Sequence, residues 1–415
     1  MRKFQEIRSG PVSAAARDLD RCARLPLFPG IEADARSVLA ALRVLVVGSG
    51  SVGFNVVLHL ARLAIGTLWI VDPGRLKKES LLTHPVLPSQ VGESKAVSAG
   101  RIAKALSPAS RVFVFDGPVE ALPLAALPAD IACMAVDNLA AEVELGTRCL
   151  NRRVRLLHVA LHGSTLCVQL RSFANRGAGD PCPACAFNEL ELAELDSGGG
   201  GYGCEGDAPP EGSRGDPGQA TVSFSSLCSL AADLLLVQLL RQVLGLGQTL
   251  ENQMLEYAGF LDRLTVTPLL ANPDCPIEHL AWSRRLAPKE LPHSSLHELV
   301  TAAGFDLDRD LARLSVMVDG LVFVERGACA CRQNVAVQRF RAPHRSLASC
   351  RRCRQPVEAH PFFSHQSVPL GRLAGLVRRP LGSLGAAGAQ AVLIRCGAEA
   401  VLLQRSLGHE EWRCA

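Results

Sequence analysis

The sequence predicts an α/β protein with a doubly wound, mainly parallel β-sheet, followed by a smaller α+β domain. Three observations carry this prediction. Short apolar runs alternate with segments whose apolar residues recur at helical spacing, a glycine cluster separates the first run from its helix, and cysteine pairs occur in both parts of the chain. A chain of 415 residues is long for one domain, so we expect two.

The first strand is predicted at Arg43–Val47, because this apolar run precedes glycines and then a helical pattern at Phe54–Leu63. A second run, Leu68–Val71, ends at Asp72. This strand, turn, helix and strand pattern continues, with helices expected at 94–106 and 140–151 and strands at 111–115, 131–136, 156–160 and 166–170. Strands that alternate with helices in this way are typical of a parallel sheet.

Beyond these elements, residues 196–218 are rich in Gly, Asp and Pro and are predicted to form a flexible crossover loop. A long helix is expected at 223–244, followed by strands at 253–257 and 264–268. Arg and Pro become more frequent after Trp282, which places a boundary near 285–288. We therefore expect an N-terminal segment (1–40), a main domain (41–287) and a C-terminal domain (288–415).

Composition excludes several classes of protein. Hydrophobic residues at 48% and charged residues at 20% are typical of a globular protein, and a net charge of +4 is too small to indicate nucleic-acid binding. No secretory signal is recognised, and the longest apolar run, Leu227–Leu240, is interrupted by Asp233 and Gln238, so no membrane span is expected. We expect a cytoplasmic protein whose 15 cysteines serve metal and thiol chemistry rather than disulfides.

The glycine cluster fits the pattern G-x-G-x-x-G at the end of a strand and the start of a helix. Gly48 permits a tight turn, Gly50 lets the backbone approach a phosphate, and Gly53 allows close packing of the helix. Amide groups at the start of the helix then hold an anion. The pattern predicts a Rossmann-like nucleotide site, and by itself it is a weak signal whose default interpretation is NAD binding.

Further motifs shift this interpretation. Asp72 follows the second strand, Gln90-Val91-Gly92 leads to Lys95, and Val136-Asp137-Asn138 follows a later strand. With the glycine loop, these motifs make residues 21–279 resemble the ubiquitin-activating-enzyme-like adenylyltransferases of the ThiF/MoeB type. A triphosphate site needs a cation and a metal ligand, which a dinucleotide site usually does without.

The resemblance implies that Lys95 binds the phosphates of ATP, that Asp137 holds Mg²⁺, and that Asp72 binds the ribose. It also implies a homodimer in which Arg24 reaches the ATP of the partner protomer. The plainer alternatives are a solvated helix residue for Lys95, a helix N-cap for Asp137 and a surface residue for Arg24.

Three positions depart from the family pattern. Gly74, Ser80 and Thr83 stand where the family carries Asp, Asn and Arg. The missing arginine removes a cation directed at phosphate, and the neighbouring His84 is the candidate substitute. These departures motivate an alternative in which the chain is a catalytically weak partner subunit or scaffold of the same fold.

Two cysteine sets predict zinc. The first joins a C-x-x-C knuckle to a downstream C-x-x-x-H pattern, which stands where members of the family that the chain resembles carry a second C-x-x-C. Thiolate and imidazole are the ligands of a structural Zn²⁺; the resemblance implies that the members are Cys182, Cys185, Cys275 and His279. The alternative is a group of packed thiols. The second is C-x-C followed by C-x-x-C, the spacing of a zinc ribbon; its members are Cys329, Cys331, Cys350 and Cys353. A redox role for this second set is less favoured, because no thioredoxin-like βαβ pattern surrounds it.

Cys204 lies in the predicted crossover loop, where many members of the family carry the cysteine that forms a thioester with the activated carboxyl group. Thiolate attack on an acyl-adenylate is chemically easy. Glu205 and Asp207 would raise the pKa of this thiol, so a loop cysteine without a role is the alternative.

The resemblance implies ATP-dependent activation of a ubiquitin-like protein with a C-terminal glycine, by adenylation and then thioester formation. The C-terminal domain resembles the extension found in bacterial ubiquitin-like conjugation operons, including antiphage ones, which implies a conjugating enzyme as a further partner. Activation of a sulfur carrier and a non-catalytic scaffold are the alternatives. A NAD-dependent oxidoreductase is a distant third.

Overall fold

The structure is a computed structural model that describes residues 4–8, 35–123, 127, 129–196, 223–329, 331, 334–342, 349–350, 352–359 and 363–405. Arg24 and Cys204 lie outside these residues. The chain divides into two compact units, and the main division lies between His279 and Leu280. We call them the N-terminal unit and the C-terminal unit. The division precedes strand β10 (Trp282–Leu286), because β10 pairs with the C-terminal strand β18 (Glu399–Gln404).

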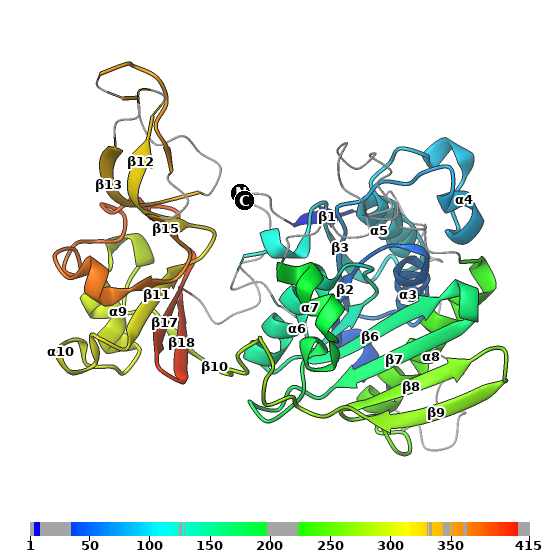
Figure 1. The fold of residues 1–415 in the computed structure, drawn as a ribbon. Helices are drawn as coiled ribbons and strands as arrows, with labels where there is room; N and C mark the ends of the chain where they lie inside the picture. The colour runs from blue at the N-terminus through cyan, green and yellow to red at the C-terminus, as the bar shows by residue number, and fades with distance from the viewer. Residues whose placement is uncertain are drawn as a thin grey trace. The chain divides into compact units, whose positions relative to one another are not determined.

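The N-terminal unit contains a nine-stranded sheet among its described residues (Figure 1). Its strands in spatial order are β1 (Gln5–Ile7), β4 (Arg111–Phe115), β3 (Thr67–Val71), β2 (Arg43–Val47), β5 (Ile131–Met134), β6 (Arg155–His162), β7 (Cys167–Phe173), β8 (Gln253–Ala258) and β9 (Arg263–Pro268). The five strands from β4 to β6 are parallel, and the others are added antiparallel at both edges. The predicted doubly wound, mainly parallel sheet is confirmed.

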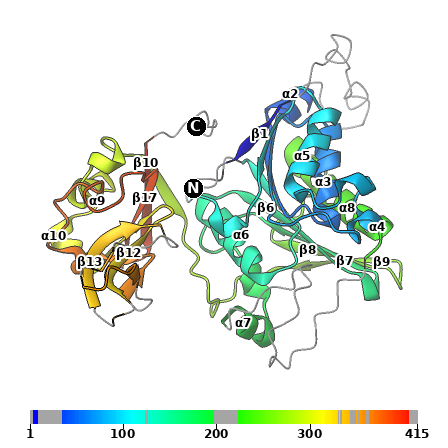
Figure 2. The ribbon, with the colours of Figure 1, turned by 90° about the horizontal axis from the view of Figure 1, so that it is seen from above.

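Helices cover both faces of this sheet (Figure 2). Helices α3, α5 and α8 lie on one face and α6 lies on the other. The bounds are α3 (Ser51–Arg62), α5 (Lys95–Leu106), α6 (Leu139–Arg152) and α8 (Ser225–Leu244), with the shorter α2 (Ala35–Ala41), α4 (Ser80–Thr83) and α7 (Glu189–Asp196). The four long helices begin and end within a few residues of the predicted bounds, because their apolar spacing is periodic throughout.

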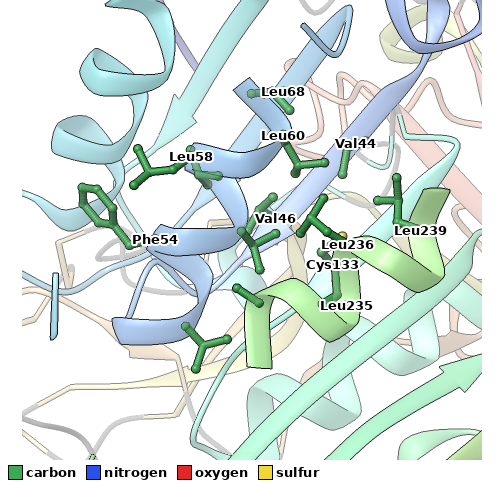
Figure 3. Close-up of a cluster of buried hydrophobic side chains, with 14 of the residues drawn as sticks. Val44, Val46, Phe54, Leu58, Leu60, Leu68, Cys133, Leu235, Leu236 and Leu239 are labelled. Atoms are coloured by element: carbon green, nitrogen blue, oxygen red, sulfur yellow. The ribbon is translucent and has the colours of Figure 1, made fainter. Parts of the chain in front are cut away.

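The core of the N-terminal unit lies between the sheet and the helices α3 and α8 (Figure 3). Val44 and Val46 of β2, Phe54 of α3 and Leu235 of α8 belong to this core cluster, and all four are fully buried. Burial of each such side chain contributes roughly 1.5–3 kcal/mol. Among the described residues α8 alone is long and apolar enough to span a membrane, but its apolar side chains supply this core.

The C-terminal unit combines two sheets with short helices, as predicted for an α+β domain. One sheet is ordered β10, β18, β17 (Ala391–Cys396), β11 (Leu314–Val318) and β16 (Val368–Pro369). The smaller sheet is built on β12 (Val322–Ala328), which pairs with β13 (Asn334–Arg341), β14 (Glu358–Ala359) and β15 (Ser364–His365). The helices are α9 (Leu296–Ala302) and α10 (Leu307–Asp310).

Candidate functional site

The predicted nucleotide-binding residues meet where the strand order of the N-terminal sheet reverses. The chain runs outward from β2 through β3 to β4, and then returns to place β5 on the other side of β2. The glycine loop follows β2, Asp72 follows β3, and Asp137 lies three residues beyond β5. Because parallel strands end at one edge of the sheet, all three segments lie at this switch point, which is where open α/β sheets bind ligands.

The three glycines of the loop meet different surroundings. Gly48 has a φ of +88°, and a Cβ on it would lie 2.3 Å from the carbonyl oxygen of Ala135. A Cβ on Gly53 would lie 1.8 Å from the carbonyl oxygen of Gly48. A Cβ on Gly50 would meet no atom within 4 Å. Gly48 and Gly53 are therefore required by the fold itself, whereas Gly50 borders open space in front of α3.

The start of α3 is suited to an anion. Its N-cap, Gly50, provides no side-chain hydrogen bond, and its first turn contains no acidic residue. The positive end of the helix dipole therefore has no compensating side chain on α3 itself. The buried Ser49 hydroxyl beside it has no hydrogen-bond partner among the described residues. These features fit the phosphates of a nucleotide.

Asp72 connects this loop to the turn after β3. One carboxylate oxygen accepts a hydrogen bond from the backbone amide of Ser49, and the other accepts one from Gly74 at 2.6 Å. Burial raises the pKa of Asp72, while the Lys95 charge and these two amides act in the opposite direction. Asp72 therefore holds two loops of the site together in addition to the ribose contact expected of it.

Lys95 is the first residue of α5, and Ser94 caps that helix by accepting a hydrogen bond from Val97. The Lys95 amide donates to the Gly74 carbonyl at 3.0 Å. Its Nζ lies 3.5 Å from the place that a Cβ on Gly74 would occupy. The ammonium group thus lies near the turn that Asp72 holds, and Lys95 as a whole residue is half-buried.

Asp137 does not cap the helix that follows it. The N-cap of α6 is Asn138, whose side chain accepts a hydrogen bond from Ala141 at 2.7 Å. The N-cap alternative for Asp137 is therefore wrong. Burial raises the pKa of Asp137, and the charge of Asp72 adds to this effect, whereas the charge of Lys95 opposes it. Two carboxylates and one ammonium group thus influence one another at this site.

Two of the three positions that depart from the family pattern make hydrogen bonds to neighbouring residues. The Ser80 hydroxyl accepts a hydrogen bond from the Lys77 amide at 3.0 Å, and the Thr83 hydroxyl contacts Nδ1 of His84 at 3.0 Å. His84 packs edge-on to Phe54, and burial lowers its pKa to about 4. His84 is therefore neutral near pH 7, and the suggestion that it substitutes for the missing cation is wrong.

A buried polar pair near the site was not predicted. Glu142 of α6 lies 3.6 Å from Nε2 of His158 on β6. Burial raises the pKa of Glu142 to about 7 and lowers that of His158 to about 3. The only sequence signal is an acidic residue on the sheet-facing side of an amphipathic helix, and this side is known only once α6 is placed.

The first cysteine set forms a compact cluster among the described residues. Sγ of Cys182 lies 3.8 Å from Sγ of Cys185 and 3.7 Å from that of Cys275, and Sγ of Cys185 lies 3.4 Å from Nε2 of His279. Ligands about 2.3 Å from a tetrahedral zinc ion are separated by roughly 3.8 Å. Burial raises the thiol pKa of Cys182 and Cys275, so a bound cation would be needed to favour their thiolates. The donor set and its spacing fit Zn²⁺.

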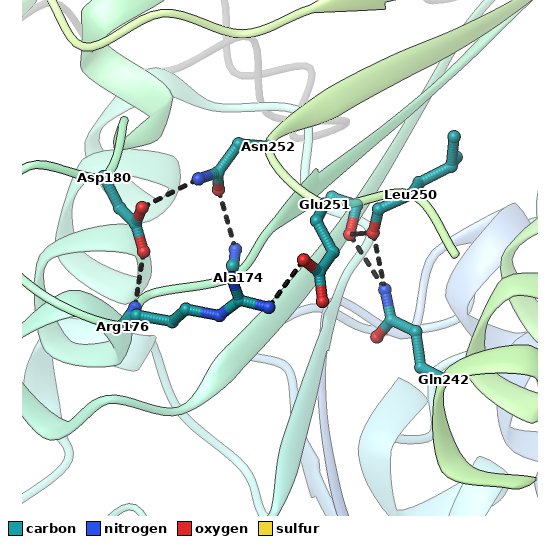
Figure 4. Close-up of polar contacts among 8 residues, drawn as sticks. Ala174, Arg176, Asp180, Gln242, Leu250, Glu251 and Asn252 are labelled. Carbon is teal, nitrogen blue, oxygen red and sulfur yellow. Dashed lines mark hydrogen bonds and ion pairs between the residues drawn. The ribbon is translucent and has the colours of Figure 1, made fainter. Parts of the chain in front are cut away.

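The knuckle of this cluster is held by packing and by a polar network. A Cβ on Gly146 of α6 would lie 2.5 Å from Cδ of Pro183, so glycine lets the helix approach the knuckle closely. Asp180, just before the knuckle, accepts a hydrogen bond from the Asn252 side chain at 2.8 Å (Figure 4). Asn252 in turn accepts one from the Ala174 amide at 2.9 Å. The loop that carries the cysteines is thereby fixed to the segment before β8.

The structure also brings the second cysteine set together, in the C-terminal unit. The four candidate ligand atoms lie within 4.8 Å of one another; they belong to Cys329, Cys331, Cys350 and Cys353. All four are free thiols. Four hydrogen bonds lower the pKa of Cys350 to about 6: two from the Cys353 and Arg352 amides, and two with the side chains of Cys329 and Cys353.

The N-terminal unit is similar to known proteins. The family model described as the ThiF family matches residues 22–277. The sulfur carrier protein adenylyltransferase of Thermus thermophilus is 24% identical over 266 residues, which span 63% of this chain and 90% of that protein. The probable adenylyltransferase/sulfurtransferase MoeZ of Mycobacterium tuberculosis is 36% identical over 106 residues, 25% of this chain and 26% of MoeZ. The structure of E. coli MccB with AMPCPP and MccA is similar with a TM-score of 0.48 at 14% identity, covering 64% of this chain and 76% of that chain.

Proposed function

The chain belongs to the ThiF family of ATP-dependent adenylyltransferases, and we propose that it adenylates the C-terminal carboxylate of a small ubiquitin-like or sulfur-carrier protein. One observation carries the proposal: an open glycine loop, an uncapped helix start, Lys95 and Asp137 all lie near the carboxyl ends of the parallel strands. A dinucleotide site would not require the last two residues.

Each of these groups has a distinct part in the proposed reaction. A carboxylate oxygen of the carrier attacks the α-phosphorus of ATP, the bond to the β-phosphate breaks, and pyrophosphate leaves as the acyl-adenylate forms. Amides at the start of α3 and the Lys95 ammonium stabilise negative charge on the phosphates. Asp72 keeps the glycine loop in place for this contact.

Asp137 would hold Mg²⁺ together with the phosphates. Bound Mg²⁺ would neutralise phosphate charge and polarise the phosphorus for attack. Its charge would also favour ionised Asp137 against the effect of burial. Arg24 would complete the site of the partner protomer in a homodimer, and the first cysteine cluster would hold a structural Zn²⁺ away from the reaction.

A sulfur carrier is the substrate that the named relatives favour, since the relative that matches most of the N-terminal unit is named a sulfur carrier protein adenylyltransferase. A protein modifier in a bacterial conjugation pathway is the second candidate. The family match ends at residue 277, so the whole C-terminal unit is additional to the adenylating unit. An added domain of this kind fits the recruitment of a further protein such as a conjugating enzyme.

Exchange of labelled pyrophosphate into ATP in the presence of the carrier tests the proposal. Lys95→Ala should lower the exchange rate at least about tenfold, because one phosphate-directed cation contributes about 1.4 kcal/mol or more to the transition state. Lys78→Ala, an exposed lysine near the same turn, is the matched control and should keep the wild-type rate. Absence of exchange with every carrier encoded beside the gene would favour the scaffold alternative.

A further inference from the structure

We infer that one Zn²⁺ bound by Cys329, Cys331, Cys350 and Cys353 takes the place of a hydrophobic core in the outer part of the smaller C-terminal sheet, and that this part folds only with the metal. We call this part the thiol module; it comprises the described residues of 326–336 and 349–359. The inference does not depend on the proposed adenylation.

The spacing of the thiols fits a tetrahedral ion. Sγ of Cys331 lies 3.8 Å from that of Cys350, and Sγ of Cys353 lies 3.8 Å from that of Cys329. Tetrahedral zinc with bonds of about 2.3 Å separates its sulfur ligands by roughly 3.8 Å. Cys329 and Cys331 are closer, at 2.8 Å, and would have to move apart by about 1 Å around the ion. Four thiolates and no carboxylate are a donor set typical of structural zinc.

The thiol module has almost no aliphatic core of its own. Its buried cluster consists of Cys329, Cys350 and Val357, with Val335 and the two other ligand cysteines packed against it. Two valines therefore supply all of the aliphatic packing in this cluster of described residues. Ordering a residue costs conformational entropy, and two valine side chains cannot offset that cost over both segments of the module.

Few backbone contacts join the second segment of the module to β12. The turn that carries Cys350 and Cys353 is closed locally, by a bridge between Ser349 and Pro356 and by hydrogen bonds within the turn. Beyond this turn, the described residues of the segment pair with β12 only through the two residues of β14. A metal ion that links the two cysteine pairs would provide the missing connection between the segments.

The opposite end of β12 is held by hydrophobic packing. Phe323 of β12 and Phe340 of β13 are fully buried, with ring centroids 5.1 Å apart, and belong to the main core of the C-terminal unit. The register between β12 and β13 shifts between Val324 and Arg326. This irregularity marks the expected border between the half of the hairpin held by the core and the half held by the metal.

Peptide-resolved hydrogen exchange and metal analysis of the full chain test the inference. Wild-type protein should contain two zinc ions per chain, and Cys350→Ser should contain one. In Cys350→Ser, amide exchange in the thiol module should accelerate at least about tenfold, while β11, β17 and β18 keep their wild-type protection, which also shows that the unit remains folded. Cys167→Ser, outside both clusters, is the control and should change neither quantity.

Two results would overturn the inference. The first is unchanged exchange in the thiol module despite loss of one zinc ion. The second is a wild-type protein whose second cysteine set carries no metal, or is linked by disulfides under reducing purification. Pyrophosphate exchange should persist in Cys350→Ser, so failure of the metal inference and failure of the proposed adenylation are distinguishable.

Discussion

The carboxylate of Asp72 accepts a hydrogen bond from the backbone amide of Ser49, and this contact fixes the glycine loop after β2 to the end of β3. Both groups are buried. The Ser49 amide therefore has its hydrogen-bond partner within the protein, whereas the amides at the start of α3 are left to bind phosphate.

Asp72→Asn should weaken ATP binding. The asparagine oxygen can accept only one of the two hydrogen bonds, and its NH₂ group would face a backbone amide, which costs about 1 kcal/mol or more in a buried site. We expect the dissociation constant for ATP to rise at least about fivefold in calorimetric titration. Asp308→Asn, an exposed aspartate of the C-terminal unit, should bind ATP like the wild type. Equal affinities of all three proteins would contradict the role assigned to Asp72.

Gly50→Ala and Gly53→Ala should fail in different ways. The methyl group at position 50 meets no protein atom within 4 Å, so thermal stability should stay within about 0.5 kcal/mol of the wild type while ATP affinity falls. The methyl group at position 53 would overlap the Gly48 carbonyl, so this variant should unfold at a lower temperature. Thermal unfolding with and without ATP separates the two effects. Retention of full ATP affinity by Gly50→Ala would contradict the proposal that the phosphates bind beside this part of the loop.

His84 should contribute to the loss of stability in acid. Its pKa is about 4 in the folded protein and about 6.5 in the unfolded chain, so between these values the unfolded chain binds a proton that the folded chain does not. Its contribution is therefore complete above pH 6.5 and is lost as the pH falls toward 4, by up to about 1.4 kcal/mol per pH unit. The unfolding midpoint of His84→Gln should depend less steeply on pH in this window. His293→Gln, an exposed histidine, should follow the wild-type slope.

Cys204 lies outside the described residues, and its role as thioester acceptor stays a prediction. If it is the acceptor, ATP and the carrier should give a covalent adduct that survives denaturation and is released by a reducing thiol. Cys204→Ala should lose the adduct and keep pyrophosphate exchange, because adenylation needs no thiol. Gel analysis with and without thiol distinguishes the outcomes. An adduct that persists in the variant would assign the acceptor to another cysteine, whereas exchange without any adduct would favour the sulfur-carrier candidate.

Much of the fold was predictable because the signals are local. The run Arg43–Val47 is one strand in the structure as predicted, since an apolar run before glycines fits few other elements. The same holds for the glycine loop and for the close pairs within the two cysteine sets, whose short spacings indicate knuckles before any tertiary contact is known. The family resemblance added Lys95 and Asp137, which composition and periodicity would not distinguish from other charged residues.

Tertiary structure decided the rest, because the deciding contacts join residues far apart in the sequence. Both Asp137 and Asn138 could cap α6, and only the placed backbone assigns the cap to Asn138. From the sequence, Trp282–Leu286 is expected at the end of the first domain, yet its pairing with the last described strand places it in the second unit. From the sequence, His84 is a candidate cation, but its burial beside Phe54 lowers its pKa and keeps it neutral near pH 7. Sequence by itself thus determined which residue types were available at the site, whereas burial and long-range pairing determined their charge and their partners.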